Sequence, residues 1–124
     1  MTRVLVVDGA NVVGSVPDGW WKDRAGAARR LHARLAVADL SWERVVLVLE
    51  GAAKGGVPRG IDGHLETVHA PRDGDSAIVS TTRAAVESGA DVIVITADRG
   101  LQTQVQVIGA RTMSPGWLLD QIGG

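Results

Sequence analysis

The sequence predicts a three-layer α/β sandwich with a mainly parallel sheet of about five strands. Short, continuous apolar runs alternate along the chain with longer segments whose apolar residues recur at helical spacing. The chain has 124 residues, of which 45% are hydrophobic and 22% charged, the balance of an ordinary globular protein. This length suits one domain, residues 1–124, with a core of its own.

The N-terminal half contains two of the predicted strands. The first is the run 4–7, three valines and a leucine, and it stops at Asp8-Gly9. A helix over 23–38 follows, with Asp23 as its N-cap and an apolar stripe at helical spacing. The second strand, 45–49, ends at Glu50. The next stretch, 51–60, contains four glycines and is predicted to be a mobile loop; it lacks the Gly-Lys-Ser/Thr ending of a Walker loop.

The C-terminal half repeats the alternation of strand and helix. The alternating run 64–68 predicts an edge strand, and a helix after residues 71–76 stops near Gly89. The apolar run 92–95 predicts a buried strand, and a helix near 100–108 ends at Gly109. A short strand over 110–113 then leads to Ser114 and Pro115, which are typical of the start of a last helix.

Composition excludes several classes of site. The formal net charge is −1 and the pI about 6.3, so no overall basic field attracts nucleic acid, although a carboxylate cluster would mask local positive charge in that total. The absence of cysteine excludes disulfides, thiolate zinc sites and cysteine nucleophiles. Too few apolar residues precede Asp8 for a signal peptide, and no apolar run is long enough to span a membrane. We therefore expect a cytoplasmic protein without a membrane segment.

Four carboxylates occupy equivalent places in the predicted fold. Asp8, Glu50 and Asp98 each follow a strand, and Asp75 begins the helix after a fourth, so all four are expected at one end of a parallel sheet. Crowded like charges repel one another unless cations neutralise them, and oxygen ligands suit Mg²⁺ or Mn²⁺. Such ions activate water and stabilise the leaving oxygen of a phosphodiester. The alternative is a set of independent loop acids, with Asp8 capping a turn and Asp75 capping its helix.

Several motifs together resemble a known family. They are Asp8-Gly9-Ala10-Asn11-Val12-Val13-Gly14, Gly74-Asp75-Ser76-x-Ile78, Ile95-Thr96-Ala97-Asp98-Arg99, Gly109-Ala110 and Met113-Ser114. In this order, over nearly the whole chain, they are similar to the YacP-like branch of the NYN family, within the PIN-like nuclease superfamily. The resemblance implies a PIN-like sheet in which the first strand lies centrally, beside the strand that ends before Asp98. It also implies Mg²⁺- or Mn²⁺-dependent cleavage of RNA.

The resemblance also assigns residues. Asp8, Asp75 and Asp98 match the metal-binding acids of the family, and Asn11 matches the polar residue behind the first of them. Glu50, a fourth candidate ligand, stands where an aspartate is expected. Three basic residues are candidate contacts for the substrate: Arg99 beside Asp98, and Lys54 and Arg59 in the glycine-rich stretch.

The leading hypothesis is therefore a metal-dependent ribonuclease that hydrolyses RNA phosphodiester bonds. Glu50 and the near-neutral charge motivate a second, an RNA- or partner-binding module with an impaired site. A third is a small-molecule or nucleotide phosphohydrolase, because a fold does not fix its substrate; Ala10 stands where haloacid-dehalogenase proteins carry an aspartate, which disfavours that variant. For Trp20 and Trp21 we favour packing over the edge of the core, and stacking on bases is the alternative. The residues leave open whether the chain forms a homodimer.

Overall fold

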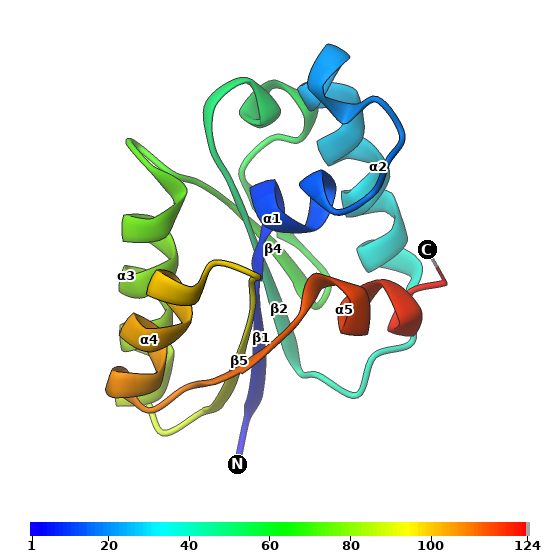
Figure 1. Cartoon of the computed structure of the whole chain (residues 1–124). Coiled ribbons are helices and arrows are strands. Elements are labelled where there is room, and N and C mark those ends of the chain that lie inside the picture. The colour runs from blue at the N-terminus through cyan, green and yellow to red at the C-terminus, as the bar shows by residue number, and fades with distance from the viewer. Residues whose placement is uncertain (124) are drawn as a thin grey trace.

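The computed structural model describes residues 1–123 and has a six-stranded sheet flanked by helices (Figure 1). The strand order is β3-β4-β2-β1-β5-β6, and every neighbouring pair is parallel except β3 with β4. The strands are β1 (Arg3–Asp8), β2 (Arg44–Leu49), β3 (Gly60–Asp62), β4 (Leu65–His69), β5 (Asp91–Ile95) and β6 (Arg111–Met113). The helices are α1 (Gly9–Gly14), α2 (Arg24–Val37), α3 (Gly74–Glu87), α4 (Arg99–Ile108) and α5 (Pro115–Gln121), with 3₁₀ turns η1 (Trp20–Lys22) and η2 (Gly51–Gly56). The predicted fold class is confirmed.

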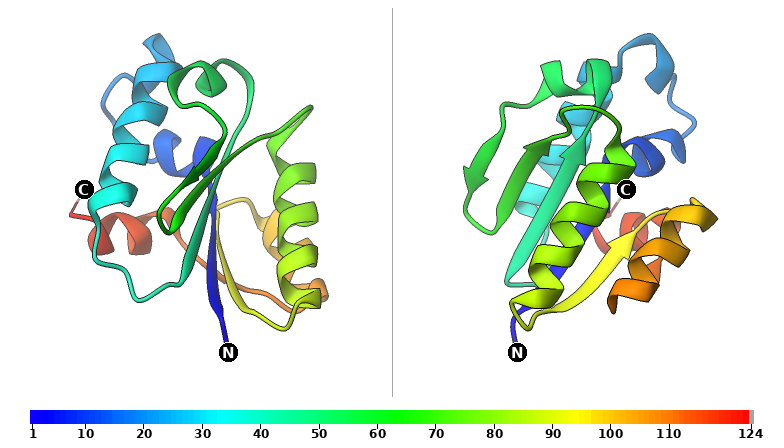
Figure 2. Two further views of the ribbon diagram at one scale, coloured as in Figure 1. Left: turned by 180° about the vertical axis from the view of Figure 1, so that it is seen from behind. Right: turned by 90° about the vertical axis from the view of Figure 1, so that its left-hand side faces the viewer.

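Helices cover both faces of the sheet, as the two further views show (Figure 2). Alternate residues of β1 point to opposite faces, because successive side chains of a strand do so. Leu5 and Val7 join the core with α1, α2 and α5, whereas Val4 and Val6 join the core with α3 and α4. Both sets are almost fully buried, which explains why the strand is apolar at every position between Arg3 and Asp8. Among residues 1–123, no helix has both the length and the apolar character that crossing a bilayer requires.

Two predictions for the middle of the chain are wrong. The strand predicted over 64–68 was expected at an edge of the sheet. It is β4, the second strand from one side, and the edge strand on that side is β3. The stretch 51–60 is not simply a mobile loop, because η2 packs against α2. Gly56 contacts the Ala25 carbonyl so closely that a Cβ there would collide with it. The Lys54 ammonium and the His69 ring also bond the backbone around this turn, at Ala70 O (2.9 Å) and Val57 O (2.7 Å).

The register of the central strands brings their carboxyl ends to one edge of the sheet. β1 lies between β2 and β5, and Asp8 pairs with Val48 while Val7 pairs with Ile95. The first strand is thus central and adjacent to the strand that precedes Asp98, as the family resemblance implies. The segments that follow β1, β2, β4 and β5 all begin at this carboxyl edge (the upper side of Figure 1).

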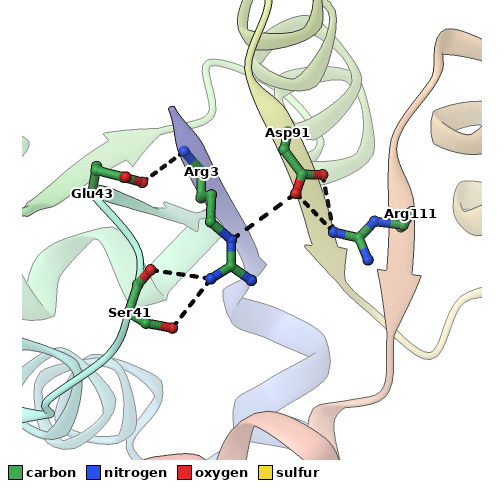
Figure 3. Close-up of polar contacts among 5 residues, drawn as sticks. All are labelled: Arg3, Ser41, Glu43, Asp91 and Arg111. Atoms are coloured by element: carbon green, nitrogen blue, oxygen red, sulfur yellow. Dashed lines mark hydrogen bonds and ion pairs between the residues drawn. The ribbon is translucent and has the colours of Figure 1, made fainter. Parts of the chain in front are cut away.

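The opposite, amino edge carries a network of paired charges (Figure 3). Arg3 donates from its backbone N–H to Glu43 Oε2 (2.6 Å) and from Nη1 to the carbonyl and hydroxyl oxygens of Ser41 (3.4 and 3.3 Å). Its Nε lies 4.0 Å from Asp91 Oδ2, and Arg111 Nη2 lies 2.9 Å from both Asp91 oxygens. The network joins β1, β5 and β6 to the segment that leads into β2.

Candidate active site

Asp8 is a buried carboxylate at the centre of the carboxyl edge, with only 4% of its surface exposed. Oδ1 accepts from the backbone N–H of Asn11 (3.3 Å), so Asp8 caps α1. Oδ2 accepts from Asn11 Nδ2 and from the Thr96 hydroxyl, both at 2.9 Å. Burial raises the pKa of the Asp8 carboxyl, and the charge of Glu50 adds to the rise, while the bonds from Thr96 and Asn11 oppose it.

Thr96 and Asn11 connect Asp8 to the turn between β5 and α4. The fully buried Thr96 hydroxyl donates to Asp8 and accepts from the backbone N–H of Asp98 (3.1 Å). Asn11 Oδ1 accepts from the N–H of Ala97 (3.1 Å). The sequence analysis assigned no role to Thr96, although its place between a buried strand and Asp98 was a usable signal. These bonds fix the spacing between the ends of β1 and β5.

Asp98 caps the helix that follows this turn. Its Oδ1 accepts from the N–H of Leu101 (3.0 Å), and the side chain is exposed at the carboxyl edge. A carboxylate cap interacts favourably with the N-terminal end of a helix dipole. One carboxylate oxygen of Asp98 is thus engaged in capping α4.

Asp75 lies in the first turn of α3, but it is not the cap. Asp73 takes that place, since its Oδ1 accepts from the N–H of Ser76 (2.7 Å) and its Oδ2 from the Ser76 hydroxyl (3.1 Å), which lowers the pKa of Asp73. The alternative that Asp75 serves as an N-cap is therefore wrong. Partial burial raises the pKa of Asp75, and the negative charges of Asp98, Asp8, Asp73 and Glu50 raise it further. The acids that follow four different strands thus share one electrostatic field.

Glu50 connects the end of β2 to the start of α3. Its Oε2 accepts from the backbone N–H of Gly74 (2.6 Å), across the segment that follows β4. A Cβ on Gly74 would lie 3.0 Å from the same oxygen, a tight contact that the end of the Glu50 side chain would relieve only by shifting. Glu50 therefore helps to position Asp75, a function that its place after the strand did not predict.

We call Asp8, Glu50, Asp75 and Asp98 the acidic edge. Within residues 1–123, none of the four forms an ion pair with Lys, Arg or His. Their oxygen donors suit a hard divalent cation in kind. As placed, however, no three or more His, Asp or Glu side chains of the described residues are grouped closely enough to hold a metal ion. The four carboxylates thus lie at one end of the sheet, as expected, without a preformed ligand group within residues 1–123.

The three basic candidates lie in different surroundings. Arg99 is the first residue of α4, next to Asp98, and is exposed. Arg59 is exposed directly before β3, at the far side of η2. Lys54 is half-buried and donates to the Ala70 carbonyl. Of the three, Arg99 is adjacent in the chain to a member of the acidic edge.

Comparison with known proteins gives a structural answer. No family model matches the chain, and no curated protein sequence matches it significantly. The crystal structure of Rae1 (YacP) from Bacillus subtilis matches with a TM-score of 0.81 and 22% identity, over 98% of this chain and 74% of that one. The chain has the fold of YacP. A tryptophan-to-leucine variant of YacP matches with a TM-score of 0.75 and 20% identity, over 98% of this chain and 76% of that one.

The likeness to YacP confirms the fold that the motif resemblance implied. At 20 to 22% identity it concerns the arrangement of the chain and not its chemistry. Nearly all of this chain lies within the shared part, so the backbone segments that carry the acidic edge belong to the shared fold.

Proposed function

We propose that this chain is a metal-dependent ribonuclease, which hydrolyses RNA phosphodiester bonds at the acidic edge. The observation that carries the proposal is the group of unpaired carboxylates at the carboxyl ends of parallel strands, where α/β proteins bind their ligands. Crowded carboxylates without basic partners are typical of sites that hold cations. The motif resemblance supports an RNA substrate, and the match to YacP supports the fold on which that resemblance rests.

The residues have separate roles in this proposal. Asp8, Asp75 and Asp98 would hold Mg²⁺ or Mn²⁺, which when bound supplies an activated water and neutralises the charge of the phosphodiester. Asn11 and Thr96 orient Asp8 through the bonds to its Oδ2. Arg99 would contact a phosphate of the strand, since it is exposed at the N-terminus of α4. Without a cation, the acidic edge repels the anionic substrate.

The test is single-turnover cleavage of a mixed-sequence RNA with Mn²⁺ or Mg²⁺ and, in parallel, with a chelator. We expect cleavage with either ion, products that carry a 5′-phosphate, and none with the chelator. Free nucleotides serve as a second substrate and should not be hydrolysed. Cleavage that persists in the chelator would contradict the proposed metal dependence, and hydrolysis of nucleotides alone would contradict the RNA substrate.

A second candidate is an RNA-binding module without catalysis. It is favoured by the lack of a preformed ligand group, since no three carboxylates within residues 1–123 form one, and by the bond that engages Glu50 with Gly74. Electrophoretic mobility shift with the same RNA separates the two. Binding that persists in the chelator, without cleavage in Mn²⁺, would favour the module.

A further inference from the structure

A cleft opens beside the acidic edge, between α1, the start of α2 and η2. Its cavity volume is about 110 Å³, and it opens to solvent. Its apolar lining includes Val13 and Leu49, and one wall is the ring of Trp20. Gly9, which directly follows Asp8, also lines it, and so does Glu50. We call this the Trp20 cleft.

The aromatic wall of the Trp20 cleft is combined with a cation. The guanidinium carbon of Arg24 lies 5.2 Å from the centre of the Trp20 ring, within the range of a cation–π contact. Trp21 contacts the Trp20 ring edge-on, with the centroids 6.0 Å apart. Nucleobases stack on tryptophan rings and on guanidinium planes alike, which makes this wall chemically suited to a base.

The polar groups of the cleft are of opposite kinds. Arg24 only donates hydrogen bonds, and the Glu50 carboxylate only accepts them. Glu50 Oε2 bonds Gly74, while no hydrogen bond within residues 1–123 engages Oε1. A planar ring that carries both donors and acceptors on its edge complements this pair, whereas a purely apolar ligand would offer no partner to Glu50 Oε1 or to the N–H groups of Arg24.

We propose that the Trp20 cleft binds one nucleobase of the RNA strand, next to the phosphate that lies over the acidic edge. This inference rests on the proposed function for its substrate class. Its place follows from the chain, because Gly9 joins the cleft directly to Asp8 and Glu50 belongs to both. The cleft is thus a subsite that selects which base flanks the cleaved bond.

The chemistry of Glu50 gives the subsite a preference. Adenine, cytosine and guanine carry an exocyclic amino group that donates to a carboxylate. Uracil has one ring N–H between two carbonyl oxygens, and these face a carboxylate unfavourably. The subsite therefore prefers a base with an amino group over uracil.

The experiment titrates the four free nucleosides into the ¹⁵N-labelled protein and follows the indole N–H signals. Nucleosides carry no phosphate, so repulsion by the acidic edge does not obscure binding. We expect saturable shifts of the Trp20 signal with adenosine, cytidine and guanosine, in about the millimolar range, and smaller shifts with uridine. Trp42 is 6% exposed beneath Arg3 at the amino edge, and its signal should stay in place.

Two variants decide whether the cleft is the site. Arg24→Gln should weaken adenosine binding about fivefold, since it removes the cation from the stacking wall. Arg29→Gln is the matched control, because it removes the same charge from an exposed position of the same helix and should leave binding unchanged. In Trp20→Leu the backbone amide of Ala10 replaces the indole as the probe, and binding should be lost. An unchanged Trp42 signal shows that each variant is folded.

The outcomes separate this inference from the proposed function. No saturable shift of the Trp20 signal, or equal affinity in Arg24→Gln and the parent, overturns the base subsite. Equal binding of uridine and adenosine overturns the preference assigned to Glu50. RNA cleavage in Mn²⁺ without nucleoside binding removes the subsite and leaves the ribonuclease, whereas nucleoside binding without cleavage does the reverse.

Discussion

The two edges of the sheet treat their carboxylates in opposite ways. At the amino edge, Asp91 lies between Arg3 and Arg111, and Glu43 accepts from a backbone N–H. At the carboxyl edge, the four acids of the acidic edge have no basic partner within residues 1–123, and partial burial together with the charges of its acidic neighbours raises the pKa of Asp75. The first arrangement connects strands, while the second keeps negative charge in place at the expense of stability. This difference is the reason why we propose the carboxyl edge as the ligand-binding end.

The buried polar bonds of the carboxyl edge contribute more to stability than the ion pairs of the amino edge. Surface ion pairs contribute about 0 to 1 kcal/mol each, and the amino-edge groups are partly exposed. A hydrogen bond to a charged group contributes about 1.5 to 3 kcal/mol, and Asp8 receives its bonds in an almost fully buried position. We therefore expect substitutions at the two edges to affect activity and stability differently.

The largest expected difference is in catalysis. Asp98→Asn should reduce single-turnover RNA cleavage in Mn²⁺ by about two to three orders of magnitude, because it removes one ligand of the proposed cation site. The fold should persist, since an asparagine oxygen accepts the N–H of Leu101 as well as the carboxylate does. Asp91→Asn is the control and should cleave like the parent. Equal cleavage by a folded Asp98→Asn protein would exclude this acid from the reaction.

The next difference concerns two equally buried threonines. Thr96→Val should lower the free energy of unfolding by about 2 kcal/mol, because Asp8 loses a donor and the N–H of Asp98 loses its acceptor. Thr82 in α3 is the control: its hydroxyl is buried and has no partner among the described residues, so Thr82→Val should be neutral or stabilising by up to about 1 kcal/mol. Urea unfolding measures both. Similar losses in the two variants would show that the Thr96 bonds do not support the edge.

The smallest expected effect is a change in the pH dependence of stability. The pKa of Asp75 is raised in the folded protein from its usual 3.8, so the unfolded chain loses this proton first as the pH rises. The parent therefore loses stability as the pH rises from 3.8 through the raised pKa of the folded protein. The free energy of unfolding of Asp75→Asn should exceed that of the parent by about 0.5 kcal/mol at pH 7, a small value because the group is exposed, and should equal it at pH 3. Thermal or urea unfolding at both pH values measures the difference.

Millimolar Mn²⁺ provides the complementary measurement for Asp75. The ion should raise the melting temperature of the parent and raise that of Asp75→Asn less, because it binds the folded state. A parent that gains nothing from Mn²⁺, or an Asp75→Asn protein less stable than the parent at pH 7, would contradict the repulsion at the acidic edge.

The sequence predicted which carboxylates lie at the carboxyl edge better than it predicted the hydrogen bonds across that edge. Apolar runs that stop at a carboxylate identified β1 and β2, and the parallel arrangement of strands then placed Asp8 and Glu50 at one end. The short strand β3 was missed, because only three exposed residues form it and no buried face leaves a pattern. The bonds of Thr96 join positions 88 residues apart, which local spacing does not encode. Whether Asp73 or Asp75 caps α3 depends on a shift of two residues in where the helix begins, which the motif alone does not define.

The backbone segments around the Trp20 cleft pack too closely to accept one added methyl group at either of two glycines. A Cβ at Gly9 would lie 2.6 Å from the Val48 carbonyl oxygen, and one at Gly56 would collide with the carbonyl of Ala25. Both glycines hold backbone against backbone, so a methyl group there would push whole elements apart. Substitutions of Trp20 or Arg24 in the wall can therefore change which ligand the cleft binds, while the backbone spacing between its walls stays the same.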